Sequence, residues 1–306
     1  MKVKIWICML LVYVLWGSTY LSIRFAVETI PPFLMAATRF LSAGLILHVW
    51  RRLAGDPAPT RKQWLSTGVI GLLLLVSGNG LLSWAEQNVP SGVAALLIGS
   101  VPLWMAAIEA VRPGGTRPNW LGILGLVVGF GGIALLIGPD LIGGSKAELQ
   151  PLGIVVLLLA AFSWSLGSIY SRHAEMPASA LLTTSMEMLA GGAGLLLLGT
   201  LTGEWRRLVV SQVTLRSWLG LVYLVIFGSM VAYTAYTWLL RNAPLSLVST
   251  YAYVNPLIAI LLGSLLAGEL LTARILAAAF VIVGSVVVIN LAPRLIRPAP
   301  SAAPAD

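Results

Sequence analysis

Residues 79–104, NGLLSWAEQNVPSGVAALLIGSVPLW, carry polar side chains and two prolines inside a strongly apolar stretch. The apolar run from 91 to 111 is long enough to cross a bilayer, since a transmembrane helix needs about 20 mainly apolar residues. The whole chain has this character: 58% of its 306 residues are hydrophobic, 10% are charged, and mean hydropathy is +0.92. Soluble domains contain roughly 25% charged residues. The composition therefore predicts an integral membrane protein.

Ten such stretches are separated by short turns rich in proline, glycine and asparagine. We predict helical spans at 5–25, 33–50, 65–86, 91–111, 119–137, 151–171, 179–201, 216–239, 246–267 and 273–292. The basic start MKVK and the apolar run after it resemble a signal peptide, but no small-residue cleavage site follows. We therefore interpret this run as the first span. The proline-rich and alanine-rich residues 293–306 are predicted to form a disordered cytoplasmic tail.

The second half of the chain repeats features of the first half. At an offset of 148 residues, Trp16 matches Trp164 and Arg24 matches Arg172. Five spans per repeat is an odd number, so the second repeat would enter the membrane upside down, as in many secondary transporters. We expect an all-α polytopic membrane protein with ten transmembrane helices in two five-helix inverted repeats. The predicted repeats are residues 1–147 and 148–292.

Basic residues indicate the orientation. With a cytoplasmic N-terminus, the inner loops and tails hold more Lys and Arg than the outer loops, and most of this bias comes from the first half. The loop that contains Arg206, Arg207 and Arg216 runs against the rule. We predict a multi-pass membrane protein with both termini in the cytoplasm.

Prolines and polar residues inside the spans are the first candidate functional groups. Pro102 and Pro256, matched at an offset of 154, each remove a backbone N–H and are predicted hinges, with a role in helix packing as the alternative. Polar side chains inside a bilayer usually face the protein interior or a cavity. The predicted hydrogen-bonding partners of a substrate, with bonds between helices as the alternative, are Asn79, Ser100, Tyr253 and Asn255.

Two charged residues fall within spans. Arg39 in the second span and Glu187 in the seventh lie at one repeat position, at an offset of 148. Charges near the middle of a membrane suggest a functional role. A structural ion pair between the two residues is the slightly preferred interpretation. Both residues therefore stand as candidate intramembrane charges.

Aromatic residues provide the next candidates. Trp16 and Tyr20 share a face of the first span, Tyr233 lies in the eighth span, and Trp164 is the repeat partner of Trp16. Trp and Tyr normally anchor helices at the membrane surface, which is the alternative for all of them. Trp16 and Trp164 lie deep in their spans, so we predict that they form walls of a substrate site.

The sequence lacks the motifs that several other classes of protein require. The single cysteine and two histidines provide no metal-binding spacing, so no metal and no cofactor are predicted. No Walker A motif indicates direct use of ATP, and no GxSxG or HExxH motif indicates an intramembrane enzyme. Lys and Arg occur in short clusters between apolar runs and form no long basic face of the kind that binds nucleic acid, so no nucleic-acid partner is predicted. The predicted partners are a small-molecule substrate and the lipid bilayer.

The chain resembles the EamA family of the drug/metabolite transporter superfamily. The resemblance covers residues 5–292 and rests on LWGSTYLSIRF (15–25), the RF at 39–40, GLLLLVSGNGLLSWAEQNVPSGVAALL (71–97) and STYAYVNPLIAILLG (249–263). It implies a central cavity built from spans 1, 3, 4, 6, 8 and 9. It also implies a location in the bacterial inner membrane and export of amino acids, aromatic ones among them, or of related metabolites.

The expected function is therefore a secondary transporter that works by alternating access. Few acidic residues line the expected path, which favours zwitterionic or neutral solutes over cationic drugs. Aromatic walls suit apolar or aromatic side chains. An exporter of drugs or other metabolites with the same fold is the alternative, and an intramembrane enzyme is disfavoured.

Overall fold

The computed structural model describes residues 2–115, 119–142 and 151–295, and within these ranges it contains helices and no strand. Eight stretches of helix are long and apolar enough to cross a membrane: Lys2–Ala26, Pro32–Leu53, Arg61–Ala85, Ser91–Val111, Pro151–Ser171, Ala180–Leu201, Leu215–Asn242 and Leu245–Ala267. They correspond to eight of the predicted spans. The other two, 119–137 and 273–292, fall on α8 (Trp120–Ile142) and α15 (Ala273–Leu295), whose described apolar parts are shorter. Most of the predicted tail lies outside the described residues.

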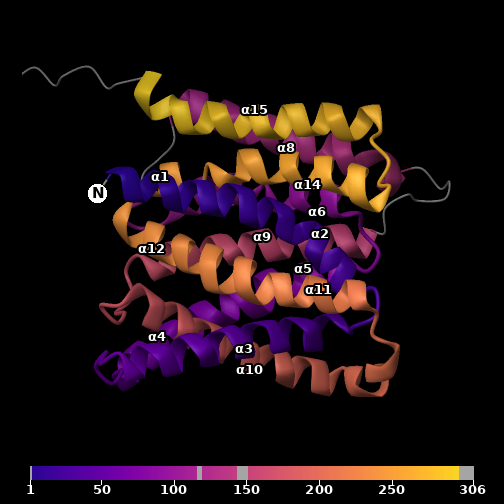
Figure 1. Ribbon diagram of the computed structural model, residues 1–306. Helices are drawn as coiled ribbons and strands as arrows, with labels where there is room; N and C mark the ends of the chain where they lie inside the picture. The colour runs from indigo at the N-terminus through magenta and orange to yellow at the C-terminus, as the bar shows by residue number, and fades with distance from the viewer. Residues whose placement is uncertain (1, 116–118, 143–150, 296–306) are drawn as a thin grey trace, which may run out of the picture.

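The helices lie side by side in one bundle (Figure 1). At one edge α3 (Pro32–Leu53) packs along α10 (Ala180–Leu201), and at the other edge α8 packs along α15. Each pair joins equivalent spans of the two repeats. The helices between these edges are α1 (Lys2–Leu11), α2 (Gly17–Ala26), α4 (Arg61–Gly71), α5 (Leu81–Ala85), α6 (Ser91–Ile98), α7 (Val101–Val111), α9 (Pro151–Ser171), α11 (Leu215–Tyr223), α12 (Thr234–Asn242), α13 (Leu245–Val248) and α14 (Tyr251–Ala267).

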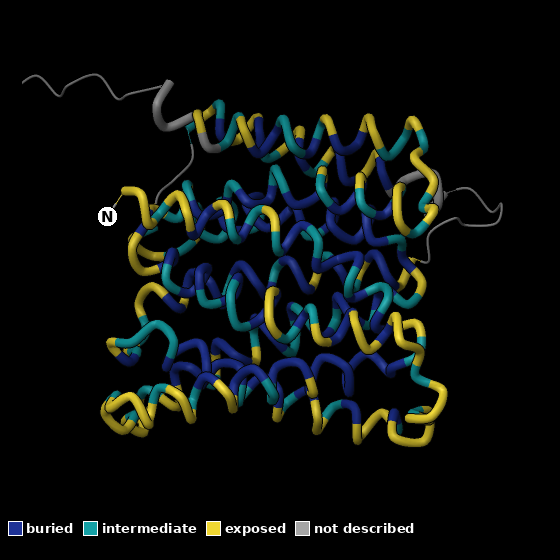
Figure 2. The backbone as a smooth tube through the Cα atoms, viewed as in Figure 1, coloured by how far each residue is buried: buried dark blue, intermediate teal, exposed yellow. Residues whose placement is uncertain are grey.

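Burial follows this arrangement. Buried residues concentrate in the middle of the bundle, and exposed residues lie on its outer faces and at the helix ends (Figure 2). Large apolar side chains such as Leu45, Leu261 and Phe280 are exposed. An apolar exterior of this kind suits lipid rather than water.

Local sequence explains where several helices begin and end. Thr60 and Gln63 form a capping box at the start of α4, and the Ser179 hydroxyl accepts from the third residue of α10. Pro32 occupies the first turn of α3, where its missing N–H has no intrahelical partner to lose. Gly268, at φ +66°, terminates α14. These residues fix the turns that bring successive helices alongside one another.

Three spans contain π-helical segments in their middle. These are η1 (Val12–Trp16) between α1 and α2, η2 (Leu72–Gly80) between α4 and α5, and η5 (Leu224–Tyr233) between α11 and α12. π-Helical turns widen a helix locally and occur often at functional sites. Here they lie in spans 1, 3 and 8, which the family resemblance assigns to the cavity.

The fourth and ninth spans are each interrupted once. The gap between α6 and α7 is residues 99–100, and the gap between α13 and α14 is residues 249–250. Pro102 lies in the first turn of α7, where proline is well tolerated, whereas Pro256 lies inside α14. The two matched prolines therefore occupy different local settings, and in both spans the interruption precedes the proline.

The arginines matched by the repeat make equivalent contacts. Arg24, in α2, donates to the carbonyls of residues 86–87 at the C-terminus of the third span. Arg172, directly after α9, donates to the carbonyls of Leu240 and Ala243 at the C-terminus of the eighth span, at 3.1 and 3.2 Å. The ends of α5 and α12 lie at opposite ends of the bundle (Figure 1). Each arginine thus closes one end of it.

Two carboxylates cap helices of the other repeat. Glu269, after α14, accepts from the backbone N–H groups of Ser91 at 2.7 Å and Gly92 at 3.1 Å, the first residues of α6. Glu204, after α10, accepts from the N–H of Leu34 in the first turn of α3 at 2.9 Å. A carboxylate at a helix N-terminus satisfies free N–H groups and complements the helix dipole. These caps join the two repeats at the end of the bundle opposite the N-terminus.

Candidate substrate site

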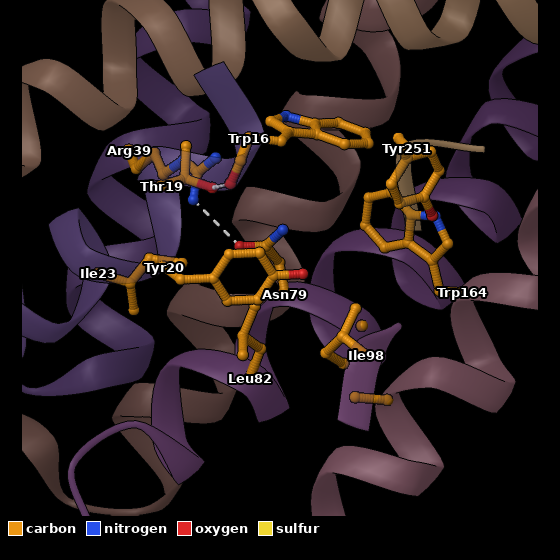
Figure 3. A pocket seen from close by; sticks show the side chains of 12 residues that line it. Trp16, Thr19, Tyr20, Ile23, Arg39, Asn79, Leu82, Ile98, Trp164 and Tyr251 are labelled. Carbon is orange, nitrogen blue, oxygen red and sulfur yellow. Dashed lines mark hydrogen bonds between the residues drawn. The ribbon is translucent and has the colours of Figure 1, made fainter. Parts of the chain in front are cut away.

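A cavity lies between the two repeats, next to η1 and η2 (Figure 3). Its lining residues come from spans 1, 2, 3, 4, 6 and 9: Trp16, Thr19, Tyr20, Ile23, Arg39, Gly78, Asn79, Leu82, Ile98, Ala160, Trp164 and Tyr251. Its volume is about 40 Å³, and a water molecule needs roughly 10–15 Å³ of such space. The cavity therefore has room for a few water molecules and is smaller than an amino acid.

Four aromatic rings form one wall of the cavity and the layer behind it. Trp16 packs edge to face against Trp164 at 5.4 Å between ring centroids and against Tyr251 at 5.6 Å, while Tyr236 lies 4.8 Å from Trp16. Both indole N–H groups are bonded to the protein itself: that of Trp16 donates to the Gly228 carbonyl and that of Trp164 to the Tyr236 hydroxyl, both at 3.1 Å. The wall therefore offers apolar ring surface.

Arg39 provides the charge of the cavity. It is only 2% exposed, its Nε donates to the Ser229 hydroxyl at 2.8 Å, and its Nη1 donates to Asn79 Oδ1 at 3.0 Å (Figure 3). These bonds use two of the five N–H groups of a guanidinium and fix its orientation. Within the described part of the chain, no carboxylate lies within ion-pair distance of Arg39. A buried guanidinium with spare N–H groups has the donors that an anion requires.

The expected ion pair between Arg39 and Glu187 is not formed among the described contacts. Glu187 instead accepts a hydrogen bond from the Tyr233 hydroxyl at 2.9 Å. Arg39 is directed to Ser229 and Asn79. Ser229 and Tyr233, both in η5, bond to Arg39 and Glu187 through neutral hydroxyl groups. The positive charge of Arg39 is therefore not neutralised by Glu187 and remains available to the cavity.

Four of the predicted substrate-binding residues do not line the cavity. The Ser100 hydroxyl donates to the Leu97 carbonyl at 2.6 Å, and the Tyr253 hydroxyl donates to the Val286 carbonyl in α15 at 2.7 Å. The Tyr233 hydroxyl is engaged by Glu187. Asn255 lies against backbone carbonyls, including that of Tyr13 in η1. These side chains satisfy the protein's own groups, which is the alternative role considered for polar residues within spans.

Tyr251 is the aromatic lining residue that the sequence argument missed. The ninth span contains Tyr251 and Tyr253, two residues apart, so they cannot share one helical face. The interruption at 249–250 sets the rotation of α14 and turns Tyr251 to the cavity. Of the predicted residues, Trp16, Tyr20, Asn79 and Trp164 do line the cavity.

Residues 4–138 and 151–291 each match the EamA-like transporter family. The chain belongs to this family. It is 37% identical to an uncharacterized inner membrane transporter, YedA of Escherichia coli (strain K12), over 95% of this chain and 92% of that protein. It is 31% identical to the protein PecM of Dickeya dadantii (strain 3937), over 82% of this chain and 80% of that protein. The chain is therefore a multi-pass membrane transporter of the EamA family.

A solved crystal structure supports the same fold. It superposes with a TM-score of 0.66, at 20% sequence identity, over 95% of this chain and 98% of the solved chain. At this identity the likeness concerns the fold alone. The two-repeat EamA architecture fits the helical arrangement described above.

Proposed function

We propose that this transporter exports amino acids, apolar and aromatic ones among them, or related small carboxylates, by alternating access. The observation that carries the proposal is Arg39, a buried cation that lines an aromatic-walled cavity without a carboxylate partner among the described residues. A carboxylate would bind the spare N–H groups of the guanidinium. The side chain of the solute would lie against Trp16, Trp164 and Tyr251.

The small volume of the cavity supports a moving carrier rather than an open channel. A site of about 40 Å³ has to enlarge before a solute of this class can enter. The aromatic wall and the interrupted ninth span meet at Tyr251, so movement of α14 would change the size of the cavity. Loading from one side and release on the other follow if the two ends of the bundle open in turn.

Counterflow in proteoliposomes tests the proposal. The matched probes are L-phenylalanine and phenethylamine, which differ by the carboxylate alone. Wild-type protein should exchange phenylalanine at least about tenfold faster, since a charge-assisted hydrogen bond contributes roughly 1.5–3 kcal/mol. Arg39→Gln should lose this preference while remaining monodisperse in gel filtration. Equal exchange of both probes by wild-type protein, or an unchanged preference in Arg39→Gln, would contradict a carboxylate site at Arg39.

A pair of tryptophan substitutions tests whether the aromatic wall binds the solute. Trp16→Ala removes apolar ring surface from the cavity and should raise the KM for phenylalanine by about 10-fold to 100-fold, from about 1.5–3 kcal/mol of lost burial. Trp218, in α11, is 43% exposed and lies outside the cavity lining. Trp218→Ala should therefore leave exchange close to the wild-type rate. A reversed order of these two effects would place the site elsewhere.

A further inference from the structure

Glu86 is the buried acid that the substrate site does not explain. Its side chain, directly after α5, is 0% exposed, and neither carboxyl oxygen has a hydrogen-bond partner among the described residues. The other buried carboxyl groups have donors: Glu187 has Tyr233, and Glu204 has the Leu34 N–H. A carboxylate buried without donors is costly, because nothing replaces the water it loses. A bound proton removes most of that cost.

The surroundings of Glu86 connect it with the cavity. Leu82, which lines the cavity, lies four residues earlier on the same side of the helix, and the Tyr20 side chain lies near the carboxyl group. The charged groups that act on Glu86 are Glu269, Arg24 and Arg39. Of these, Arg39 alone is a cavity residue.

The other two charges already have partners. Arg24 donates to the backbone carbonyls of residues 86–87, and Glu269 caps α6. Arg39 is thus the cation whose positive charge a bound substrate carboxylate would neutralise. Any anion that binds Arg39 adds a second negative charge near Glu86.

We propose that Glu86 is a proton-binding site and that a proton and the substrate occupy the carrier together. This inference rests on the proposed function, because it assumes that a substrate carboxylate binds Arg39. An ionised Glu86 would be repelled by that carboxylate, so at a pH where the empty carrier has lost this proton, loading favours uptake of a proton from water by a Glu86 oxygen. The reverse step returns the proton to water when the substrate leaves, and no other bond is made or broken.

Binding of a proton and the substrate to the same carrier determines the direction in which the proton moves. The proton and the substrate cross in the same direction, so export is driven by the outward gradient of the substrate. Acid on the outer side opposes net export, because it favours the protonated form of Glu86 that retains substrate. Alkaline conditions on that side favour release.

Binding measurements on the purified full chain test the linkage, with L-phenylalanine as the probe. Calorimetry in two buffers of different ionisation enthalpy should show uptake of a proton with binding by wild-type protein and no uptake by Glu86→Gln. As pH rises above the value at which the empty protein loses the Glu86 proton, the wild-type affinity should fall by about tenfold per pH unit, whereas that of Glu86→Gln should stay level. Glu109→Gln is the matched control, since Glu109 pairs with Arg112 and lies outside the cavity, and it should behave as wild type.

Infrared titration provides a readout that needs no substrate. The band of a protonated buried carboxyl group should persist to higher pH in wild-type protein than in Glu86→Gln. Proton uptake that survives in Glu86→Gln, or tighter binding on addition of sodium ions at constant pH, would overturn the proposal. If phenylalanine binds neither protein, the proposed substrate class is wrong, and the infrared difference still decides whether Glu86 holds a proton.

Discussion

Arg39 and Glu187 occupy the same position in the two repeats, and each bonds to its own side chain of η5 rather than to the other. Arg39 donates to Ser229 at 2.8 Å, and Glu187 accepts from Tyr233 at 2.9 Å. The repeat also relates the partners, since Asn79, which accepts from Arg39 at 3.0 Å, matches Tyr233 at an offset of 154. The bonds Arg39–Asn79 and Glu187–Tyr233 are therefore equivalent contacts with reversed charge. Arg39, the positively charged residue of this matched pair, lines the cavity, and Glu187 does not.

The contacts of Arg24 and Arg172 predict opposite conformational effects. Arg24→Gln should weaken the end of the bundle opposite the N-terminus, and Arg172→Gln should weaken the N-terminal end, because each change removes donors to helix-terminal carbonyls. A hydrogen bond to a charged donor contributes roughly 1.5–3 kcal/mol, enough to change a population about tenfold.

The measurement is labelling of Thr19→Cys, in the cavity, by an impermeant thiol reagent. Carried in a Cys8→Ser background, this cysteine should react faster from outside intact cells in Arg24→Gln and no faster in Arg172→Gln. Equal acceleration by both changes would show that the arginines do not act on separate ends.

The prolines are predicted to be unequal hinges. Pro256 lies inside α14, where its ring removes a helical hydrogen bond, so Pro256→Ala should stiffen the helix and slow phenylalanine exchange several-fold. Pro102 lies in the first turn of α7 and should contribute less, so that Pro102→Ala has the smaller effect on exchange. Wild-type exchange in both variants would reduce the prolines to packing features.

The orientation of the chain is predicted from its basic residues. With a cytoplasmic N-terminus, the exposed turn at Ala58 faces the cytoplasm and the exposed segment at Ser211 faces outward. In a Cys8→Ser background, Ser211→Cys should be labelled by an impermeant reagent added to intact cells, and Ala58→Cys should be labelled after lysis only. The opposite pattern would reverse the predicted orientation.

Glu204 predicts a specific dependence of stability on pH. Burial raises the pKa of Glu204 above its ordinary value of 4.5. The folded protein therefore holds this proton more tightly than the unfolded chain, so its stability should fall as pH rises from about 4.5 through the raised pKa. Glu204→Gln keeps an acceptor for the Leu34 N–H and should remove this decline.

Thermal unfolding of the purified protein over a pH series provides the measurement. Glu109→Gln, whose parent side chain forms a surface pair with Arg112, should retain the wild-type profile. Identical pH profiles for wild-type protein and Glu204→Gln would exclude a contribution from this carboxyl group.

Much of the architecture follows from hydropathy alone. Helices in a bilayer must satisfy their own backbone hydrogen bonds, so an apolar run of about 20 residues leaves little choice of structure. The predicted span 246–267 coincides with Leu245–Ala267, and the matched Arg24 and Arg172 make equivalent contacts.

The site was harder to predict, because helix rotation decides which residue faces a cavity. Trp16 and Trp164, which were predicted from depth and repetition, line the cavity. Tyr251 also lines it but was not predicted, whereas the predicted Tyr253 bonds to Val286. The interruption at 249–250 and the π-helical segments change the phase of a helix without a regular sequence signal. The sequence placed Arg39 and Glu187 at one repeat position and suggested an ion pair between them. Hydropathy could not show that two different side chains of η5, Ser229 and Tyr233, would bond to them instead.

Glu269 caps α6 at one end of this repeated structure, and among the described residues its repeat equivalent cannot cap a helix at the other end. Gly268 at φ +66° and Gly114 at φ +73° are repeat equivalents, but the residue after Gly114 is Gly115, which has no side chain with which to cap α13. Among the described residues, the caps on Ser91 and Gly92 thus have no counterpart at the N-terminal end. Two conformations that a perfect repeat would make equal in free energy then differ, and the empty carrier should rest with its N-terminal end the easier one to open.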